Sequence, residues 1–514
     1  MATITSAASG DWDASGTWDA GVPASGDDVV VTGAHDVAIN VDVTCASLTT
    51  TAYSGTLTQN AGQEFTVDGD IAWSGGTFTG GDSAITAEAF ALTGGTWTST
   101  SDTFSVDRGA GGYIAETLFL YSGGTFTHSS GTVRFDYTQG GGVWSILTLD
   151  CTSTPTFNNV TFEGGRNSAS YSVKWTLSGS ATVAGDLSIN PDAGRYLLLD
   201  GGTYSVGGNI SSAAGASGGT SVISLAGTST YSGVTAGKFP KLQILAGATV
   251  TAATADATCQ SFSQTGGSFT CPTGTFSIDR GAGNNIAETL FLYSGGTFTH
   301  GGGSSTVRFD YLQGSSVWSV LTLDCTSTPT FNNVTFEGGR NSASYPVKWT
   351  LSGTANVAGD LIISPDAGYY LLLDGGAYSV AGDLSCAANS NGGTTAITLS
   401  GTGVQTVTQT AGSWPAGAWT NSNTAGHVIQ ATNVTLGGAL TTATDSRWCQ
   451  ETYDLAVTGT VTNNGALIKD NAGVSSPTIG SGNAVEIGPC VAVVAAAGPF
   501  AVGAFDKGWA TAWR

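Results

Sequence analysis

A long internal duplication constrains what this chain can fold into. Residues Thr103–His128 and Thr275–His300 differ at three positions, and residues Thr132–Asp186 and Thr306–Asp360 differ at seven. The similarity fades after residues 204 and 378. A chain that accepts a whole additional module has an architecture in which each unit contacts mainly its neighbours. The duplication therefore favours a solenoid or a fibre built from stacked modules.

A short signature recurs along the chain: two glycines followed by a small residue and an aromatic residue. Successive occurrences lie 19 and 29 residues apart, from Gly75 to Gly94 and from Gly94 to Gly123, which is the scale of one solenoid coil. A glycine pair can form a corner with positive φ, and the strand after it would direct its aromatic side chain inward. The signature occurs at Gly75–Phe78, Gly94–Trp97, Gly123–Phe126, Gly201–Tyr204, Gly266–Phe269, Gly295–Phe298 and Gly375–Tyr378.

Composition favours strands over helices. The chain has 76 Gly, one Met and 10% charged residues, so strong helix formers are scarce. The 40% of hydrophobic residues argues against disorder. The sequence predicts an all-β fold, an elongated parallel β-helix (β-solenoid) with an internal duplication. Tandem β-sandwich domains are the alternative, but Asn-Gly hairpin dipeptides occur only at residues 391–392 and 464–465.

The charge pattern argues against several functions. The formal net charge is −22, and the 15 basic residues form no cluster, so we expect no nucleic-acid partner. The acidic residues are spread thinly, which favours a role in solubility over repulsion of anionic polymers or scattered calcium sites. No DxDxDG-like loop, zinc-spaced Cys or His pair, P-loop, Rossmann fingerprint or HExxH motif is present. We therefore expect no metal and no cofactor.

Two cysteines distinguish the copies. Cys271 stands where the first copy has Ser99, and Cys386 stands where it has Ser212. Interchange of small residues is typical of buried positions, since protein cores accept free thiols readily. We expect Cys271 and Cys386 to be free, buried thiols, with a disulfide between them as the alternative.

The first 50 residues carry a recognisable pattern of a Trp, a Gly-Val-Pro, an acidic stretch, a turn with Gly and His, and short Val/Ile strands. Its residues are Trp18, Gly21, Val22, Pro23, Gly26, Asp27, Asp28, Val29, Gly33 and His35. This opening resembles the start of β-helix proteins of phages and bacterial surfaces. The resemblance implies the first coils and the cap of a parallel β-helix. It implies no particular activity, because virion fibres, adhesins and depolymerases share such openings.

The repeat divides the chain into four regions. We expect an N-terminal cap with the first coils at 1–90, copy 1 of the solenoid repeat at 91–262 and copy 2 at 263–430. A C-terminal cap or oligomerisation region would follow at 431–514, because the last coil of a solenoid otherwise exposes its core and its strand edges.

The termini carry no evident targeting segment. No charged and apolar leader is visible at the N-terminus, and the most apolar run, Cys490–Phe505, is too short for the about 20 residues of a spanning helix. We therefore expect no membrane insertion and synthesis in the cytoplasm. A β-rich fibre made without an export signal fits a virion, and a cell-surface or extracellular protein is the alternative.

The sparse charged residues include a duplicated set that could carry chemistry. Two carboxylates about 5–10 Å apart can hydrolyse a glycosidic bond, and a carboxylate with an arginine could support a lyase. Surface ion pairs at coil corners are the simpler interpretation, and a duplicated active site is unusual, so we expect no catalytic residue. The set comprises Asp107, Arg108, Glu116, His128, Arg134, Asp136 and Glu163, repeated as Asp279, Arg280, Glu288, His300, Arg308, Asp310 and Glu337.

Duplicated aromatic residues are the candidates for ligand binding. Exposed aromatic faces stack on sugar rings, although such residues are more often buried or in contact with another subunit. We expect most of them to be buried and about a third to be exposed. The candidates are Tyr121, Tyr137, Trp144 and Trp175 with their equivalents Tyr293, Tyr311, Trp318 and Trp349. Tyr171 and Tyr345 form a further duplicated pair in the same segment.

These features favour a non-enzymatic structural or adhesive fibre protein. A phage virion component such as a tail fibre, spike or head fibre that contacts host surface glycans is the preferred hypothesis. A bacterial adhesin or extracellular filament is the first alternative. A polysaccharide depolymerase, either a lyase or a glycosidase, on the same fold is the second.

The tail predicts a homo-oligomer, with a trimer favoured. Apolar and aromatic residues gather between Val491 and Trp513, and closed rotational symmetry is the usual arrangement of identical chains. Truncation at about Gly480 should therefore yield monomer or aggregate, measured by light scattering. An unchanged subunit number in the truncated chain would show that the tail is only a cap.

Overall fold

The computed structural model describes residues 2–142, 144–234, 236–283, 286–314, 318–469 and 486–487. It divides into two compact units, Met1–Pro272 and Thr273–Arg514. The fold is 56% strand and 1% helix, and its parallel strands form stacked coils, so the predicted β-solenoid is confirmed. The tail residues between Val491 and Trp513 lie outside the described residues.

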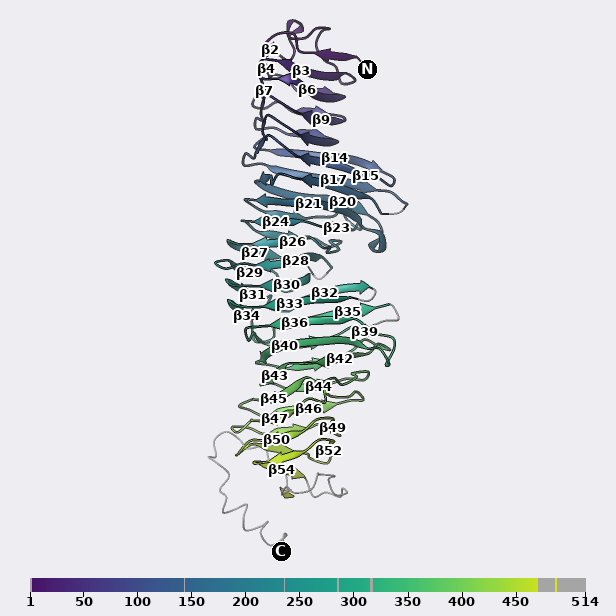
Figure 1. The fold of residues 1–514 in the computed structure, drawn as a ribbon, viewed down its shortest axis with the longest axis vertical. Coiled ribbons are helices and arrows are strands. Elements are labelled where there is room, and N and C mark those ends of the chain that lie inside the picture. Colours follow the sequence, from purple (N-terminus) through teal and green to yellow (C-terminus); the bar gives the residue numbers. More distant parts are fainter. Residues whose placement is uncertain are drawn as a thin grey trace. The chain divides into compact units, whose positions relative to one another are not determined.

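Unit 1 consists of rows of parallel strands, each strand pairing with its equivalents one coil before and one coil after (Figure 1). The first row holds β1 (Thr3–Thr5), β3 (Asp28–Gly33), β6 (Ser47–Tyr53), β9 (Asp70–Trp73), β12 (Ala89–Leu92), β15 (Ala115–Tyr121), β18 (Ile146–Cys151), the start of β21 (Val173–Val183) and β23 (Leu197–Asp200). The second holds β2 (Gly10–Asp11), β4 (Val37–Ile39), β7 (Thr56–Gln59), β10 (Thr77–Thr79), β13 (Thr96–Thr98) and β16 (Thr125–Thr127).

Two further rows complete this unit. One holds β5 (Val43–Cys45), β8 (Phe65–Val67), β11 (Ile85–Ala87), β14 (Thr103–Gly111), β17 (Thr132–Gln139), β20 (Asn159–Arg166), β22 (Leu187–Ile189), β25 (Ile210–Ser212), β27 (Thr228–Ser232), β29 (Thr249–Ala252) and β31 (Ser268–Thr270). The other holds β19 (Thr156–Phe157), the end of β21, β24 (Thr203–Val206), β26 (Val222–Leu225), β28 (Lys238–Ile244) and β30 (Ala257–Gln264). Two short 3₁₀ helices, η1 (Ser15–Thr17) and η2 (Ala169–Tyr171), interrupt the strands.

Unit 2 is built in the same way from parallel strands. Its strands are β32 (Thr275–Gly283), β33 (Ala287–Tyr293), β34 (Thr297–Thr299), β35 (Thr306–Gln313), β36 (Val320–Cys325), β37 (Thr330–Phe331), β38 (Asn333–Phe336), β39 (Gly339–Arg340), β40 (Val347–Val357), β41 (Leu361–Ile363), β42 (Leu371–Asp374), β43 (Ala377–Val380), β44 (Leu384–Cys386), β45 (Ala396–Leu399), β46 (Gln405–Gln409), β47 (Trp419–Asn421), β48 (Val428–Gln430), β49 (Val434–Leu436), β50 (Leu440–Thr442), β51 (Arg447–Cys449), β52 (Leu455–Val457), β53 (Val461–Asn463), β54 (Ala466–Lys469) and β55 (Glu486–Ile487).

The glycine signature forms the corners that the sequence predicts. The second glycine of three successive pairs has a positive φ, at Gly76 (69°), Gly95 (72°) and Gly124 (77°). These corners stack closely, because a Cβ on Gly124 would lie 2.5 Å from the carbonyl oxygen of Gly95. The aromatic residue after each pair points inward, and Phe78 and Trp97 are fully buried.

Aromatic side chains stack along the core of each unit. Phe78 and Trp97 lie face to face with their ring centroids 3.8 Å apart, and Phe135 stacks on Phe162 at 5.3 Å. The second copy repeats the latter contact between Phe309 and Phe336, whose rings are 5.2 Å apart. Each copy therefore uses the same core contact between two successive coils.

The coils become longer where the duplicated sequence begins. Inward residues that pair across successive coils are 19 residues apart from Ile85 to Phe104, but 29 apart from Phe104 to Val133 and 27 from Val133 to Val160. Strands β14, β17 and β20 have nine, eight and eight residues, whereas β11 has three. These strands reach farther sideways than those of the preceding coils in Figure 1. The added residues lengthen one side of the coil, and the pairing register shifts at irregularities between Asp107 and Ala110 and between Thr117 and Phe119.

Cys271 and Cys386 are both free and buried, as predicted. Within the part of the chain that the structure describes, no helix has the length and hydropathy needed to cross a membrane.

The stacked glycine corners lead to a stability prediction. Gly124→Ala should lower the free energy of unfolding by about 2 kcal/mol or more, because an alanine at positive φ costs about 1–2 kcal/mol and its Cβ collides with the Gly95 carbonyl. Gly112→Ala is the matched control, since a Cβ there meets nothing within 4 Å and copy 2 already carries Asn284. Equal denaturation midpoints for the two variants would contradict the proposed role of the corners.

Candidate functional site

Four successive coils of copy 1 turn at the same side of unit 1, and we call this region the copy 1 corner. It consists of residues 112–114, 140–142, 144–145, 167–172 and 190–196, together with Arg166 and Lys174 at the strand ends that flank the third turn. Strand pairing places these turns one above another, because Gly111 pairs with Gln139 and Gln139 with Arg166 where the strands enter them. Where the strands leave the turns, Ala115 pairs with Ile146 and Ile146 with Lys174.

Exposed aromatic side chains lie on three of these turns in succession. Tyr113 is 53% exposed, Trp144 is 42% exposed and Tyr171 is 47% exposed. The rings of Trp144 and Tyr171 are 6.4 Å apart and inclined at 70°. Tyr113 borders Gly142 on the next turn, since a Cβ on that glycine would lie 3.9 Å from the Tyr113 Cβ. The copy 1 corner thus presents one exposed ring on each of three successive coils, and we call these three rings the row.

The basic residues of the copy 1 corner are already engaged with other groups. Lys174 Nζ lies 5.4 Å from the centre of the Trp144 ring and 2.8 Å from a carboxylate oxygen of Asp200. The buried Arg166 guanidinium lies 5.1 Å from the Tyr171 ring centre and donates a hydrogen bond to the Tyr171 carbonyl. These contacts hold the rings in place, because each cation attracts the negative face of its aromatic partner.

Copy 2 repeats the central pair of this row. Trp318 and Tyr345 are 42% and 44% exposed, and their rings are 5.9 Å apart and inclined at 80°. Arg340 lies 5.2 Å from the Tyr345 ring centre, as Arg166 does in copy 1. The flanking residues differ, since the positions of Tyr113 and Arg195 carry Asn285 and Tyr369. Asn285 lies outside the described residues.

The remaining aromatic candidates are not available to a ligand at the surface. Six of the eight are at most 8% exposed because their strands alternate and place these side chains in the core. They are Tyr121, Tyr137, Trp175, Tyr293, Tyr311 and Trp349. Only Trp144 and Trp318 of the eight are exposed, because both follow a turn segment outside the strand alternation.

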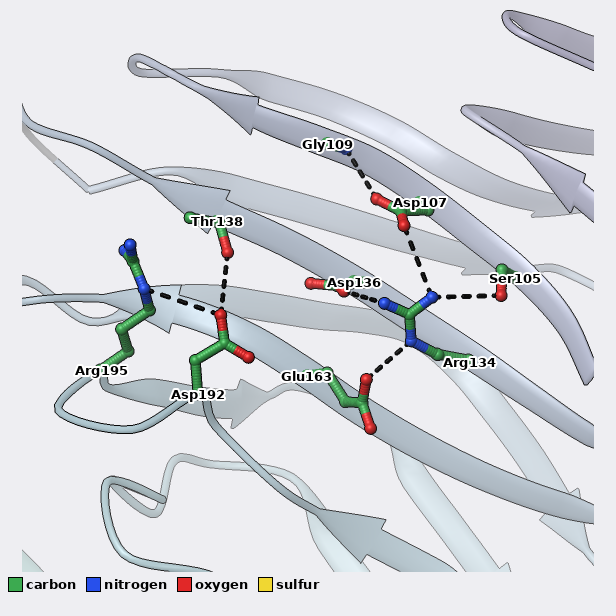
Figure 2. A network of polar contacts seen from close by, with 9 residues as sticks. All are labelled: Ser105, Asp107, Gly109, Arg134, Asp136, Thr138, Glu163, Asp192 and Arg195. Atoms are coloured by element: carbon green, nitrogen blue, oxygen red, sulfur yellow. Dashed lines mark hydrogen bonds and ion pairs between the residues drawn. The ribbon is translucent and has the colours of Figure 1, made fainter.

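A second cluster, the Arg134 cluster, lies beside the copy 1 corner on the outer side of β14, β17 and β20 (Figure 2). Arg134 forms ion pairs with Asp136, with Glu163 at 2.6 Å and with Asp107 at 3.4 Å. It also donates to Ser105 at 3.3 Å. The cluster therefore holds three carboxylates for one guanidinium. The sequence-based placement of these groups at coil corners was wrong, because outward strand positions bring them together across three coils.

Asp192, in the last turn of the copy 1 corner, lies close enough to the Arg134 cluster for its charge to raise the pKa of Asp136. The carboxylate of Asp192 accepts a hydrogen bond from Thr138 at 3.1 Å and lies 3.6 Å from Arg195 Nε. Arg195 Nη1 also donates to the carbonyl oxygens of Gln139 and Gly165 at 3.3 and 3.4 Å. Figure 2 shows the contacts of Asp192 as a group separate from those of Arg134.

Burial shifts the protonation of one carboxylate in each copy. Burial raises the pKa of Asp136 to about 6, which the Arg134 charge opposes and the neighbouring Asp107 charge reinforces. In copy 2, burial and then the Asp279 charge raise the pKa of Asp310 to about 6 against the Arg308 charge. Arg308 contacts Glu337 at 3.2 Å and Asp310 at 3.9 Å.

The other charged candidates make separate contacts. Arg108 pairs with Glu116 at 3.0 Å and Glu88 at 3.2 Å, and Arg280 pairs with Glu288 at 2.7 Å. His128 Nδ1 lies 2.8 Å from the carbonyl oxygen of Ser129. Among the described residues, no group of three or more His, Cys, Asp or Glu side chains is arranged to hold a metal ion.

The set of site residues predicted from the sequence lacks Tyr113, Arg166, Lys174 and Arg195, which all lie at the copy 1 corner. Glycines mark the turns in the sequence, with Gly111 and Gly112 before Tyr113 and Gly140–Gly142 shortly before Trp144. The glycines alone do not separate Trp144 from the buried Trp97, because each of these residues lies two positions after a glycine run. The alternation of buried residues in β21 does separate the buried Trp175 from Trp144.

Comparisons with protein-family models, with curated protein sequences and with solved structures find no match for this chain. The class of protein is therefore defined by the structure itself, which is a parallel β-solenoid.

The pKa of Asp136 and Asp310 leads to a prediction about stability and pH. A carboxyl group that titrates near 6 when folded and near 3.8 when unfolded stabilises the fold below pH 3.8 and loses this contribution as the pH rises to 6. Between pH 4 and 7 the free energy of unfolding of the native chain should fall by about 2–3 kcal/mol per site. The double variant Asp136→Asn/Asp310→Asn should not show this fall. Denaturation midpoints followed by tryptophan fluorescence at several pH values measure this.

Asp107→Asn is the control for this experiment. It removes another carboxylate from Arg134 and leaves the buried Asp136 to titrate, so the loss of stability with pH should remain but be smaller, because the Asp107 charge contributes to the raised pKa of Asp136. If the double variant and the native chain show the same change with pH, the assignment to Asp136 and Asp310 is wrong.

Proposed function

We propose that this chain is a non-enzymatic structural and adhesive fibre protein that contacts surface glycans through the copy 1 corner and through the equivalent Trp318–Tyr345 pair of copy 2. The observation that carries the proposal is the exposed Trp144–Tyr171 pair, repeated as Trp318–Tyr345 on a second set of coils. Exposed aromatic rings lose water readily and stack on the apolar faces of sugars. Two equivalent sites on one chain increase the avidity for a repetitive surface.

A solenoid suits this role for a physical reason. Its inter-coil hydrogen bonds and core aromatic stacks hold the corners rigidly, so that little conformational entropy is lost when a ligand binds. A phage virion appendage is the setting that we propose, supported by the N-terminal resemblance to β-helix proteins of phages. A bacterial surface adhesin would use the same corners in the same way.

A polysaccharide depolymerase is the alternative from a different class. The Arg134 cluster gives it some support, because Asp136 has the raised pKa that a general acid needs. The same cluster also argues against it. Arg134 forms ion pairs with Asp107, Asp136 and Glu163, so its carboxylates are engaged with a cation within the protein. We therefore assign this cluster a structural role.

The proposed function is tested by binding to surface polysaccharides without their cleavage. Trp144→Ala/Trp318→Ala should weaken binding about tenfold or more, since removal of a central aromatic contact typically costs over 1 kcal/mol. Val22→Ala/Val404→Ala is the matched control, because both valines are exposed apolar residues outside the corners. Affinity electrophoresis in gels that contain the polysaccharide measures the binding.

The same samples are assayed for released reducing ends and for unsaturated sugars. We expect neither product. Product formation that disappears in Asp136→Asn/Asp310→Asn would establish the depolymerase instead. Binding that is unchanged in Trp144→Ala/Trp318→Ala would contradict the assignment of glycan binding to these aromatic residues.

A further inference from the structure

The copy 1 corner carries three exposed rings, whereas copy 2 repeats the central pair as Trp318 and Tyr345. The arrangement of the three rings restricts the kind of ligand that the corner can bind. Tyr113, Trp144 and Tyr171 occupy three successive coils, and Arg195 follows on the fourth. Adjacent strands are about 4.8 Å apart, so the row extends along the stacking direction over roughly 15 Å. Recognition of a single terminal sugar would instead need a pocket in which polar groups converge on one ring. An open row of rings fits successive units of an extended chain.

The charged side chains near the copy 1 corner also restrict the kind of ligand that it can bind. The Arg134 cluster has three carboxylates around one guanidinium, and the charge of Asp192 in the corner acts on Asp136 of this cluster. The corner's own cations offset this only in part, because Lys174 is paired with Asp200 and Arg195 lies beside Asp192. Arg166, buried against Tyr171, offsets one of the cluster's two net negative charges. Because the Debye length is about 10 Å at 0.1 M salt, the carboxylates nearest the turns would contribute most to the repulsion of a polyanion.

We propose that the copy 1 corner binds a linear, neutral polysaccharide that lies along the stacking direction and contacts at least three successive coils. This proposal rests on the proposed glycan-binding function and specifies the ligand class and its orientation. Trp144 and Tyr171 form the central contact. Tyr113 extends it by one coil and is a specificity-determining residue, because copy 2 has Asn285 at that position.

The differences between the copies support a distinct role for this row. Of the ten differences in the two most similar blocks, seven fall in or directly beside the turns of the corner. They are Gly112/Asn284, Tyr113/Asn285, Thr138/Leu312, Gly141/Ser315, Gly142/Ser316, Ile146/Val320 and Ser172/Pro346. The Trp–Tyr pair itself is unchanged. Surface turns diverge more readily than the elements that they connect, so the unchanged Trp–Tyr pair is the part of the corner that both copies retain.

The experiment uses the full chain with Trp318→Ala, which leaves copy 1 as the aromatic site. The probes are soluble linear mannan, galactan and β-glucan, each compared with the same polymer oxidised to carboxylate at its primary hydroxyls. Fragments of two, four and eight sugar units of the best-bound polymer test the length. Biolayer interferometry measures the dissociation constants at 0.1 M salt.

We expect a neutral polymer to bind at least tenfold more tightly than its carboxylated form, and the difference to shrink at high salt. Four-unit fragments should bind at least tenfold more tightly than two-unit fragments. Tyr113→Asn, which introduces the copy 2 residue, should weaken binding of the four-unit fragment about threefold to tenfold. It should leave the two-unit fragment unchanged, and Val22→Ala should change neither.

The outcomes of this experiment distinguish an error in this inference from an error in the proposed function. Equal or tighter binding of the carboxylated polymer, or equal binding of two-unit and four-unit fragments, would overturn this inference and leave the proposed function standing. An unchanged affinity of Tyr113→Asn for the four-unit fragment would also overturn it. If no polymer bound, or if Trp144→Ala in the same background bound equally well, the proposed function would be contradicted as well.

Discussion

Parallel hydrogen bonding between successive coils is the constraint on which the rest of each unit depends. It requires neighbouring coils to approach within one strand spacing, and at corners such as Gly95 and Gly124 this close approach depends on the absence of a Cβ. It also keeps inward side chains in register, so that Phe135 lies on Phe162 and Phe309 on Phe336. The core is therefore repetitive, and functional variety is confined to outward positions and corners.

Side chains at outward positions form functional clusters because the coils stack on one another. Arg134 meets Asp107 and Glu163 because these residues occupy equivalent places on coils 27 to 29 residues apart in the sequence. The aromatic row of the copy 1 corner arises in the same way, with one ring from each of three coils. A solenoid of this kind builds a site along its axis, where a globular enzyme would build a pocket.

The sequence allowed the architecture to be predicted, but only part of the candidate site. The glycine pairs and inward aromatic residues follow a local rule, so positions such as Gly95 and Trp97 could be interpreted without a structure. Trp144 and Trp175 are the same residue type, and only the strand alternation around Trp175 separates the buried ring from the exposed one. The Arg134 cluster could not be found, because its assembly depends on the exact length of each coil.

The longer coils of the duplicated block also have a mechanical consequence. Inter-coil hydrogen bonds run along the stacking direction, so a force that pulls the end of one unit along this direction loads them one coil at a time. Each detached coil then becomes unfolded polypeptide that can extend under the force. With about 3.4 Å per extended residue, the 19-residue coil from Ile85 to Phe104 releases about 65 Å and the 29-residue coil from Phe104 to Val133 about 100 Å. The coils that carry the aromatic corner would thus absorb more extension per rupture than the narrow coils before them.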